Sequence, residues 1–162
     1  MAENPLRAET RDWLWEVDFG VESHGFAPHG RDYIFVIEAA ATYELTLTHV
    51  VELAFETRVR DDVWPHSWSD TFIDYSRWEA DGCPSGYVWG SHTSLAYPGL
   101  VAPDDDARAR KWSERLGFPM YAMSVETDRF KVSMIFHAVR ARKLSDDAPF
   151  IRQVIVPNPP LH

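Results

Sequence analysis

The stretch from Tyr43 to Val59, YELTLTHVVELAFETRV, alternates between apolar or aromatic residues and residues that are mostly Glu, Thr or Arg. A repeat of two predicts a β-strand with one buried face, although the overlapping stretch EAAATYEL alone is compatible with a helix. Such a strand would span about 56 Å, whereas a compact chain of this length has a radius of gyration of about 15 Å. We therefore expect the strand to bend or break, either at His49 and Val50 or at the preceding Ala39–Ala41.

Several other segments also have the composition of strands. Residues 32–39, DYIFVIEA, form a nearly continuous apolar run, which is typical of a strand covered on both faces. Alternating apolar residues from Trp13 to Val21 predict an earlier strand, with the segment VESHGFAPHGRD linking the two. Further strand segments are predicted at 69–78, 86–97, 120–144 and 150–156, and the long segment should divide into a hairpin at Thr127–Arg129.

One helix is indicated at about residues 104–116. Pro103 precedes it, acidic residues occupy its first turn, Trp112 and Leu116 lie four positions apart, and Gly117 follows as a C-terminal stop. No internal repeat or polar linker divides the chain. The sequence therefore predicts a mainly β fold, a single-domain antiparallel barrel or sandwich of about eight strands with one inserted helix.

The length, net charge and cysteine content of the chain limit its domain organisation, its partners and its location. The chain has 162 residues, so we expect residues 1–162 to form a single globular domain with 157–162 as a tail. Its 16 Lys and Arg against 25 Asp and Glu give a net charge of −9, which disfavours nucleic acid as a partner. Charged residues interrupt every long apolar stretch, so no membrane span is expected. With Cys83 as the only cysteine and a start, MAENPLRAET, that lacks the apolar core of a signal peptide, we expect a cytoplasmic protein.

Two histidines lie within apolar strand patterns. His49 occupies a predicted core-facing position between Leu47 and Val51, and His137 lies within the stretch SMIFHAV. A buried imidazole must form hydrogen bonds or stay neutral, so each position calls for an explanation. If both lie on the concave face of a curved sheet, they could act as a general acid/base pair. The alternative is that each is a hydrogen-bonded core residue or lies at a strand end.

The segment DVWPHSWSDTFIDYSRWEADG is dense in aromatic and acidic residues. Such residues could form the mouth of a pocket for a hydrophobic or cationic ligand, or the aromatic side chains could cap the core of a β fold. We predict Asp74 as a third catalytic residue, and Tyr43, Tyr75 and Trp78 as ligand-binding residues.

Glu22, His24 and His29 are candidate metal ligands in the segment VESHGFAPHGRD. Glu22 and His24 are two residues apart and would project from one face of a strand, while His29 would return from the turn after Pro28. The spacing matches no established metal motif, and the glycines and proline around His29 are typical of a turn. We therefore favour a turn over a metal site in this segment.

No glycine-rich phosphate-binding loop occurs, so no cofactor is expected. The leading hypothesis is a cofactor-free lyase, isomerase or cyclase that binds a small hydrophobic molecule in an aromatic pocket of a β-barrel and uses histidine acid/base chemistry. The alternative is a non-catalytic interaction or assembly protein, such as a homo-oligomer subunit, an immunity-type protein or a phage structural protein. In that alternative, exposed aromatic residues would form the contact surface.

Overall fold

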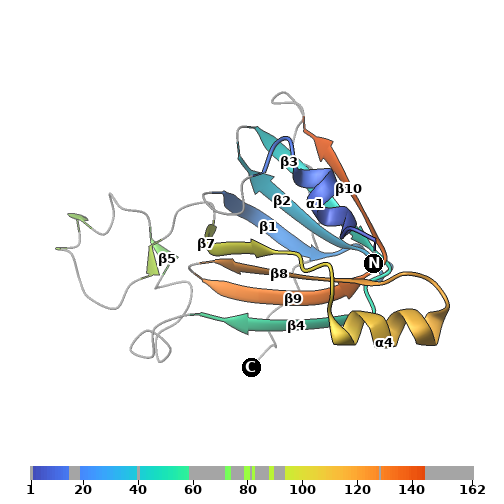
Figure 1. Cartoon of the computed structure of the whole chain (residues 1–162). Coiled ribbons are helices and arrows are strands. Elements are labelled where there is room, and N and C mark those ends of the chain that lie inside the picture. The colour runs from blue at the N-terminus through green and yellow to red at the C-terminus, as the bar shows by residue number, and fades with distance from the viewer. Residues whose placement is uncertain are drawn as a thin grey trace.

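Eight antiparallel strands, arranged as two groups of four, form the body of the protein in the computed structural model (Figure 1). The first group contains β1 (Gly20–Phe26), β2 (Tyr33–Glu38), β3 (Thr42–Thr48) and β10 (Ala138–Lys143), and the second contains β4 (Glu52–Thr57), β7 (Ser94–Val101), β8 (Tyr121–Thr127) and β9 (Phe130–Phe136). The strands pair in the order β10-β3-β2-β1-β7-β8-β9-β4, and only two residue pairs join β1 to β7. The sheets do not close among the described strands, and the predicted mainly β fold of about eight strands is confirmed.

The structure describes residues 2–14, 19–39, 41–58, 94–127 and 129–144, together with short segments at 72–73, 79–80, 82 and 88–89. Within the short segments, β5 (Phe72–Ile73) and β6 (Val88–Trp89) pair in parallel as a separate small sheet. The predicted last strand at 150–156 and the tail at 157–162 lie outside the described residues.

The long alternating stretch is one bent strand, as its length requires. β3 ends at Thr48 and β4 begins at Glu52, and between them His49 has a φ of 51°, the only positive φ of a non-glycine residue in the described part of the chain. β9 and β10 also follow each other closely, and only His137 separates them. Because β3 pairs with β10 and β4 with β9, this two-stranded ribbon passes from one sheet to the other. The predicted bend at His49 and Val50 is confirmed.

The turn between β1 and β2 holds this bend. The carboxylate of Asp32 accepts a hydrogen bond of 3.2 Å from the backbone N–H of His49, and the carbonyl of Arg31 accepts one of 2.8 Å from Val50. Two further backbone hydrogen bonds, of 3.0 and 2.9 Å, join the two strands of the ribbon within the bend. These hydrogen bonds therefore satisfy the backbone N–H and C=O groups that would stay unpaired where the bend interrupts the pairing of the strands.

The main core lies between the two sheets. Side chains from both groups of strands alternate between facing this core and facing outward, as the period of two requires. Ten described side chains larger than alanine face it and are at most 2% exposed, namely Val21, Phe35, Ile37, Leu45 and Leu47 from the first group and Met123, Val125, Val132, Met134 and Phe136 from the second. Burial of each such side chain contributes about 1.5–3 kcal/mol, so this layer holds the two sheets together.

The predicted helix is α4 (Ala107–Leu116), which packs against the second group of strands (Figure 1). Asp106 caps its first turn by accepting hydrogen bonds from two backbone N–H groups, and Gly117 ends it with a φ of 77°. Ala109 and Trp112 pack against a second apolar cluster on the outer face of β8 and β9, formed by Met120, Ala122 and Ile135.

The structure also contains a helix that the alternating pattern does not predict, α1 (Pro5–Thr10). Asn4 caps it, because its side-chain oxygen accepts a hydrogen bond of 3.1 Å from the N–H of Leu6. The side-chain nitrogen of Asn4 donates to the carbonyls of Pro103 and Ala122 at 3.0 and 2.8 Å, and Leu6 is fully buried in the main core. The cap and this buried leucine therefore fix the N-terminal segment against β8.

The first strand begins later than the alternation predicts. β1 starts at Gly20, whereas Trp13, the predicted start, follows α1, and residues 15–18 lie outside the described part of the chain. The segment predicted as a linker is strand as far as Phe26, and the turn is confined to residues 27–32. At Trp13 the correction has a local cause, because the backbone N–H groups of Trp13 and Leu14 both donate to the carbonyl of Thr10 at the end of α1, at 3.2 and 2.9 Å.

Replacing His49 by glycine should relieve strain, because glycine adopts a positive φ without the steric penalty of a Cβ atom. We expect His49→Gly to exceed His49→Val in free energy of unfolding by about 1–2 kcal/mol, measured by urea unfolding. His29→Gly and His29→Val, in the exposed turn without a positive φ, provide the matched control pair. Equal stabilities for the two position-49 variants would contradict this account of the bend.

Candidate functional site

A cavity of about 840 Å³ opens between the two sheets, at the end where β1 turns into β2. Its wall is mainly apolar and combines residues of β1 and β2 with residues of β4 and β9. The lining includes the apolar and aromatic side chains of His24, Phe26, Tyr33, Leu53, Phe55 and Phe130, with Glu22, Ser23, Ser94 and Arg129 adding polar groups. Volume and composition are typical of a small-molecule site.

A β-bulge in β1 turns His24 toward the core side of the sheet. Val21 lies opposite Ile37 and His24 lies opposite Phe35, so the chain advances three residues on β1 for two on β2. Residues directly opposite in an antiparallel pair point to the same side, and both β2 residues face the main core. Without the bulge, strict alternation would place Val21 and His24 on opposite faces.

Aromatic rings surround His24. Its ring centroid lies 4.3 Å from that of Phe130, 5.6 Å from that of Phe55 and 6.1 Å from that of Phe35, with interplanar angles of 31°, 21° and 26°. The Phe55 and Phe130 rings are 5.5 Å apart at 23°. Phe55 is 47% exposed, so this cluster of rings is open to solvent on one side.

Nδ1 of His24 and the hydroxyl of Tyr33 form a hydrogen bond of 2.6 Å. Burial lowers the pKa of His24 from 6.5 to about 4, and burial also raises the pKa of Tyr33 above its ordinary range. Both groups are therefore uncharged at neutral pH, and either can donate, depending on the imidazole tautomer. Within the described part of the chain, Nε2 of His24 has no hydrogen-bond partner, so it is a polar atom that the cavity offers to a ligand.

The two histidines predicted as an acid/base pair are close together but lie outside this cavity. The ring centroids of His49 and His137 are 5.6 Å apart with an interplanar angle of 83°, and both rings contact Phe118. His49 is exposed, so the prediction that it faces the core is wrong. The physical reason is the left-handed backbone at His49, which interrupts the alternation at the bend.

The predicted ligand-binding residues are only partly described. Tyr43 stacks on Trp13, with ring centroids 3.9 Å apart and an interplanar angle of 15°, and does not line the cavity. The hydrogen bond from Trp13 Nε1 to the carbonyl of Glu9 holds this stack against the end of α1. Asp74, Tyr75 and Trp78 lie outside the described residues.

The structure does not bring the three candidate metal ligands together. His24 packs among the aromatic rings, whereas His29 is exposed in the turn, with its Nε2 3.5 Å from the carboxylate of Asp32. In the part of the chain that the structure describes, no group of three or more His, Cys, Asp or Glu side chains is placed to hold a metal ion. Glu22 and His24 both line the cavity, whereas His29 does not.

Most residues that line the cavity are missing from the sequence prediction, among them Tyr33, Phe55 and Phe130. One signal was available, because Phe55 lies on the apolar face of the alternating stretch. The pairing of β4 with β9 brings Phe130 to Phe55, whereas Tyr33 comes from β2 in the first group of strands.

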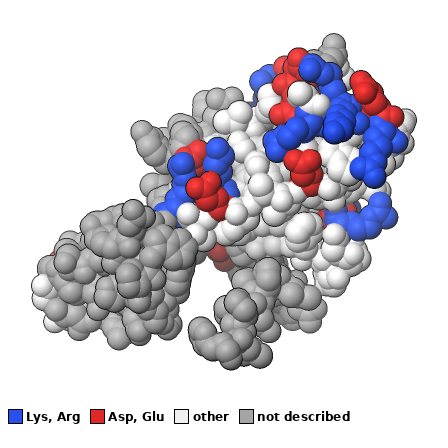
Figure 2. Space-filling view, turned by 90° about the horizontal axis from the view of Figure 1, so that it is seen from below, with Lys and Arg blue, Asp and Glu red and all other residues white. Residues whose placement is uncertain are grey.

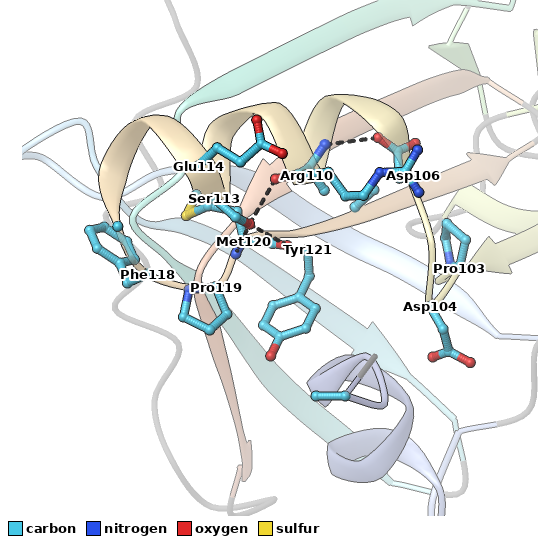
Figure 3. A pocket seen from close by; sticks show the side chains of 14 residues that line it. Pro103, Asp104, Asp106, Arg110, Ser113, Glu114, Phe118, Pro119, Met120 and Tyr121 are labelled. Carbon is cyan, nitrogen blue, oxygen red and sulfur yellow. Dashed lines mark hydrogen bonds between the residues drawn. The ribbon is translucent and has the colours of Figure 1, made fainter.

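A smaller hollow of about 540 Å³ lies beside α4, between this helix, the turn that follows it and the start of β8 (Figure 3). Its lining is more strongly charged, but several of these charges already have partners. Arg110 pairs with Asp105, and Asp104 pairs with Arg7 at 3.0 Å. We therefore favour the larger aromatic cavity as the functional site.

Charges on the described surface are mixed. On the face seen in Figure 2, basic and acidic side chains lie side by side in clusters separated by uncharged surface. Ion pairs of 3.1 Å join Arg108 to Glu52 and Arg142 to Glu44. No helix in the described ranges combines the length and the apolar character needed to span a membrane.

Comparison with known proteins identifies a family. A model of the family described as YxiG-like protein matches residues 2–153, which is most of the chain. No curated protein and no solved structure matches the chain.

The lowered pKa of His24 predicts a specific dependence of stability on pH. The folded protein binds the His24 proton at about pH 4, whereas an unfolded histidine binds it at 6.5, so the unfolded state gains the proton first as the pH falls. The contribution of His24 to stability is present above pH 6.5 and is lost between pH 6.5 and 4. From pH 7 to pH 5, this loss should amount to about 2 kcal/mol.

Urea unfolding of the wild type and of His24→Phe at both pH values measures this contribution. The variant should lack this part of the decrease, whereas His29→Gln should retain it because His29 is exposed in the turn. A decrease of the same size in the wild type and in His24→Phe would contradict the burial of a neutral His24.

Proposed function

The chain belongs to the YxiG-like protein family, and we propose that it binds a small, flat, mainly apolar molecule in the cavity between its two sheets. The observation that carries the proposal is His24, an imidazole placed inside an aromatic cavity with Nε2 unused by the described residues. A buried polar ring is costly in a cavity wall unless it has partners, and a ligand atom would supply the missing one.

The shape of the cavity indicates the class of ligand. The rings of His24 and Phe130 both lie against Phe55, at interplanar angles of 21° and 23°, so a flat aromatic ring can pack against the exposed side of Phe55. The hydrogen-bonded pair of His24 and Tyr33 suits a ligand that carries a hydroxyl, amide or carbonyl group. Because both groups are neutral, the pair favours an uncharged polar group over an ion.

Binding is better supported than acid/base catalysis. A general base works best when its pKa lies near the working pH, and a pKa of about 4 makes His24 a weak base at neutral pH. A cofactor-free lyase, isomerase or cyclase that uses His24 and Tyr33 is therefore our second choice for this cavity. It would require that ligand binding raise the pKa of His24.

Titration with 2-naphthol, a flat aromatic probe with one hydroxyl, tests the proposal. We expect backbone amide shifts in two-dimensional NMR spectra to concentrate on β1, β4 and β9. Phe55→Ala should weaken binding about tenfold, because an aromatic contact contributes about 1–2 kcal/mol. Phe118→Ala is the matched control, since Phe118 is a second exposed phenylalanine, at 37%, away from the cavity.

Equal affinities of wild type and Phe55→Ala, or shifts that avoid the cavity, would contradict the proposal. Light scattering on the same sample tests the alternative of an interaction or assembly protein. A stable oligomer that does not bind 2-naphthol would favour that alternative.

A further inference from the structure

The bent ribbon places two histidines from distant parts of the sequence side by side. His49 lies between β3 and β4 and His137 between β9 and β10, so both occupy the bend where the ribbon leaves one sheet for the other. Their ring centroids are 5.6 Å apart, and Phe118 lies against both rings at 6.4 and 4.8 Å. Neither histidine lines the aromatic cavity, so this pair is separate from the proposed ligand site.

The tautomer of His137 is fixed by a hydrogen bond. Its Nδ1 lies 2.7 Å from the carbonyl oxygen of Pro119, which can only accept, so Nδ1 carries a proton. In the neutral ring, the lone pair is then on Nε2. Histidines that bind metal ions usually donate their other ring N–H to a carbonyl or carboxylate in this way.

His49 is held in the left-handed region of the backbone. A non-glycine residue with a φ of 51° carries strain of about 1–3 kcal/mol, and glycine would fit the bend without this strain. The backbone N–H of His49 is fixed by Asp32, but its imidazole has no hydrogen-bond partner among the described residues. The fold therefore keeps an exposed imidazole next to the oriented ring of His137.

From this geometry, we infer that His49 and His137 together bind a divalent transition-metal ion such as Zn²⁺. With Zn–N bonds of about 2.0–2.1 Å and each ligating nitrogen about 1.1 Å from its ring centroid, two imidazoles on one tetrahedral ion have centroids about 5 Å apart. The observed 5.6 Å is close to this value, and rotation of the exposed His49 side chain accounts for the difference. Imidazole nitrogens suit zinc, copper and nickel ions, and two ligands leave the remaining positions open to water or to a ligand from outside.

Isothermal titration of the full-length, untagged chain with ZnCl₂ tests the inference. We expect one Zn²⁺ per chain, with affinity reduced at least about tenfold in His49→Gln and in His137→Gln. His29→Gln is the matched control, because His29 is an exposed histidine in a neighbouring turn, and should bind as the wild type does. Thermal unfolding of each variant establishes that it is folded.

Two results would overturn the inference. One is an absence of binding at millimolar Zn²⁺, and the other is binding that neither glutamine substitution weakens, which would place the ion elsewhere on the chain. Nitrogen-15 NMR of the histidine rings adds a measurement that does not depend on the variants. The metal-free protein should show the proton of His137 on Nδ1, and Zn²⁺ should shift its Nε2 signal, whereas a proton on Nε2 would contradict the site.

Discussion

The packing of the two sheets depends on backbone hydrogen bonds that continue through a bend in two paired strands. β3 and β4 form one bent strand, β9 and β10 form another, and the two stay paired as they pass from one sheet to the other. Because the pairing continues, the two sheets cannot separate without breaking the ribbon that joins them. The apolar faces of both sheets are thereby brought opposite each other, and the main core forms between them. The turn before β2 supports the same bend through Asp32 and Arg31.

The cavity results from a second departure from regular pairing. The bulge in β1 moves His24 to the side of the sheet that faces β4 and β9, where strict alternation after Val21 would place Ser23. Tyr33 satisfies one ring nitrogen, and burial keeps the imidazole neutral. A ring of this kind combines aromatic contact area with one available polar atom, which is what recognition of a small, weakly polar molecule requires.

Much of the fold follows from local patterns, whereas little of the site does. The alternation after Tyr43 and its excessive length predict a strand that bends at His49 and Val50 or at Ala39–Ala41, and the structure has the bend at the first of these places. The ends of α4 also follow from the sequence, because Asp106 and Gly117 lie at them. The same alternation predicts that His49 faces the core, which is wrong because a left-handed residue interrupts the period. His49 and His137 do lie close together, as the predicted pair requires, but they meet near the surface and not in the core.

The sequence by itself determined the mainly β class, most of the described strands, helix α4 and the need for a bend in the stretch after Tyr43. These properties depend on residues that are neighbours along the chain, through the period of side chains and the chemistry of caps and turns. Tertiary structure alone decided that His24, Tyr33, Phe55 and Phe130 line one cavity. A bulge of one residue reverses the direction of every side chain after it. Pairing between strands that are distant in the sequence determines which side chains become neighbours. Neither effect leaves a periodic signal in the sequence.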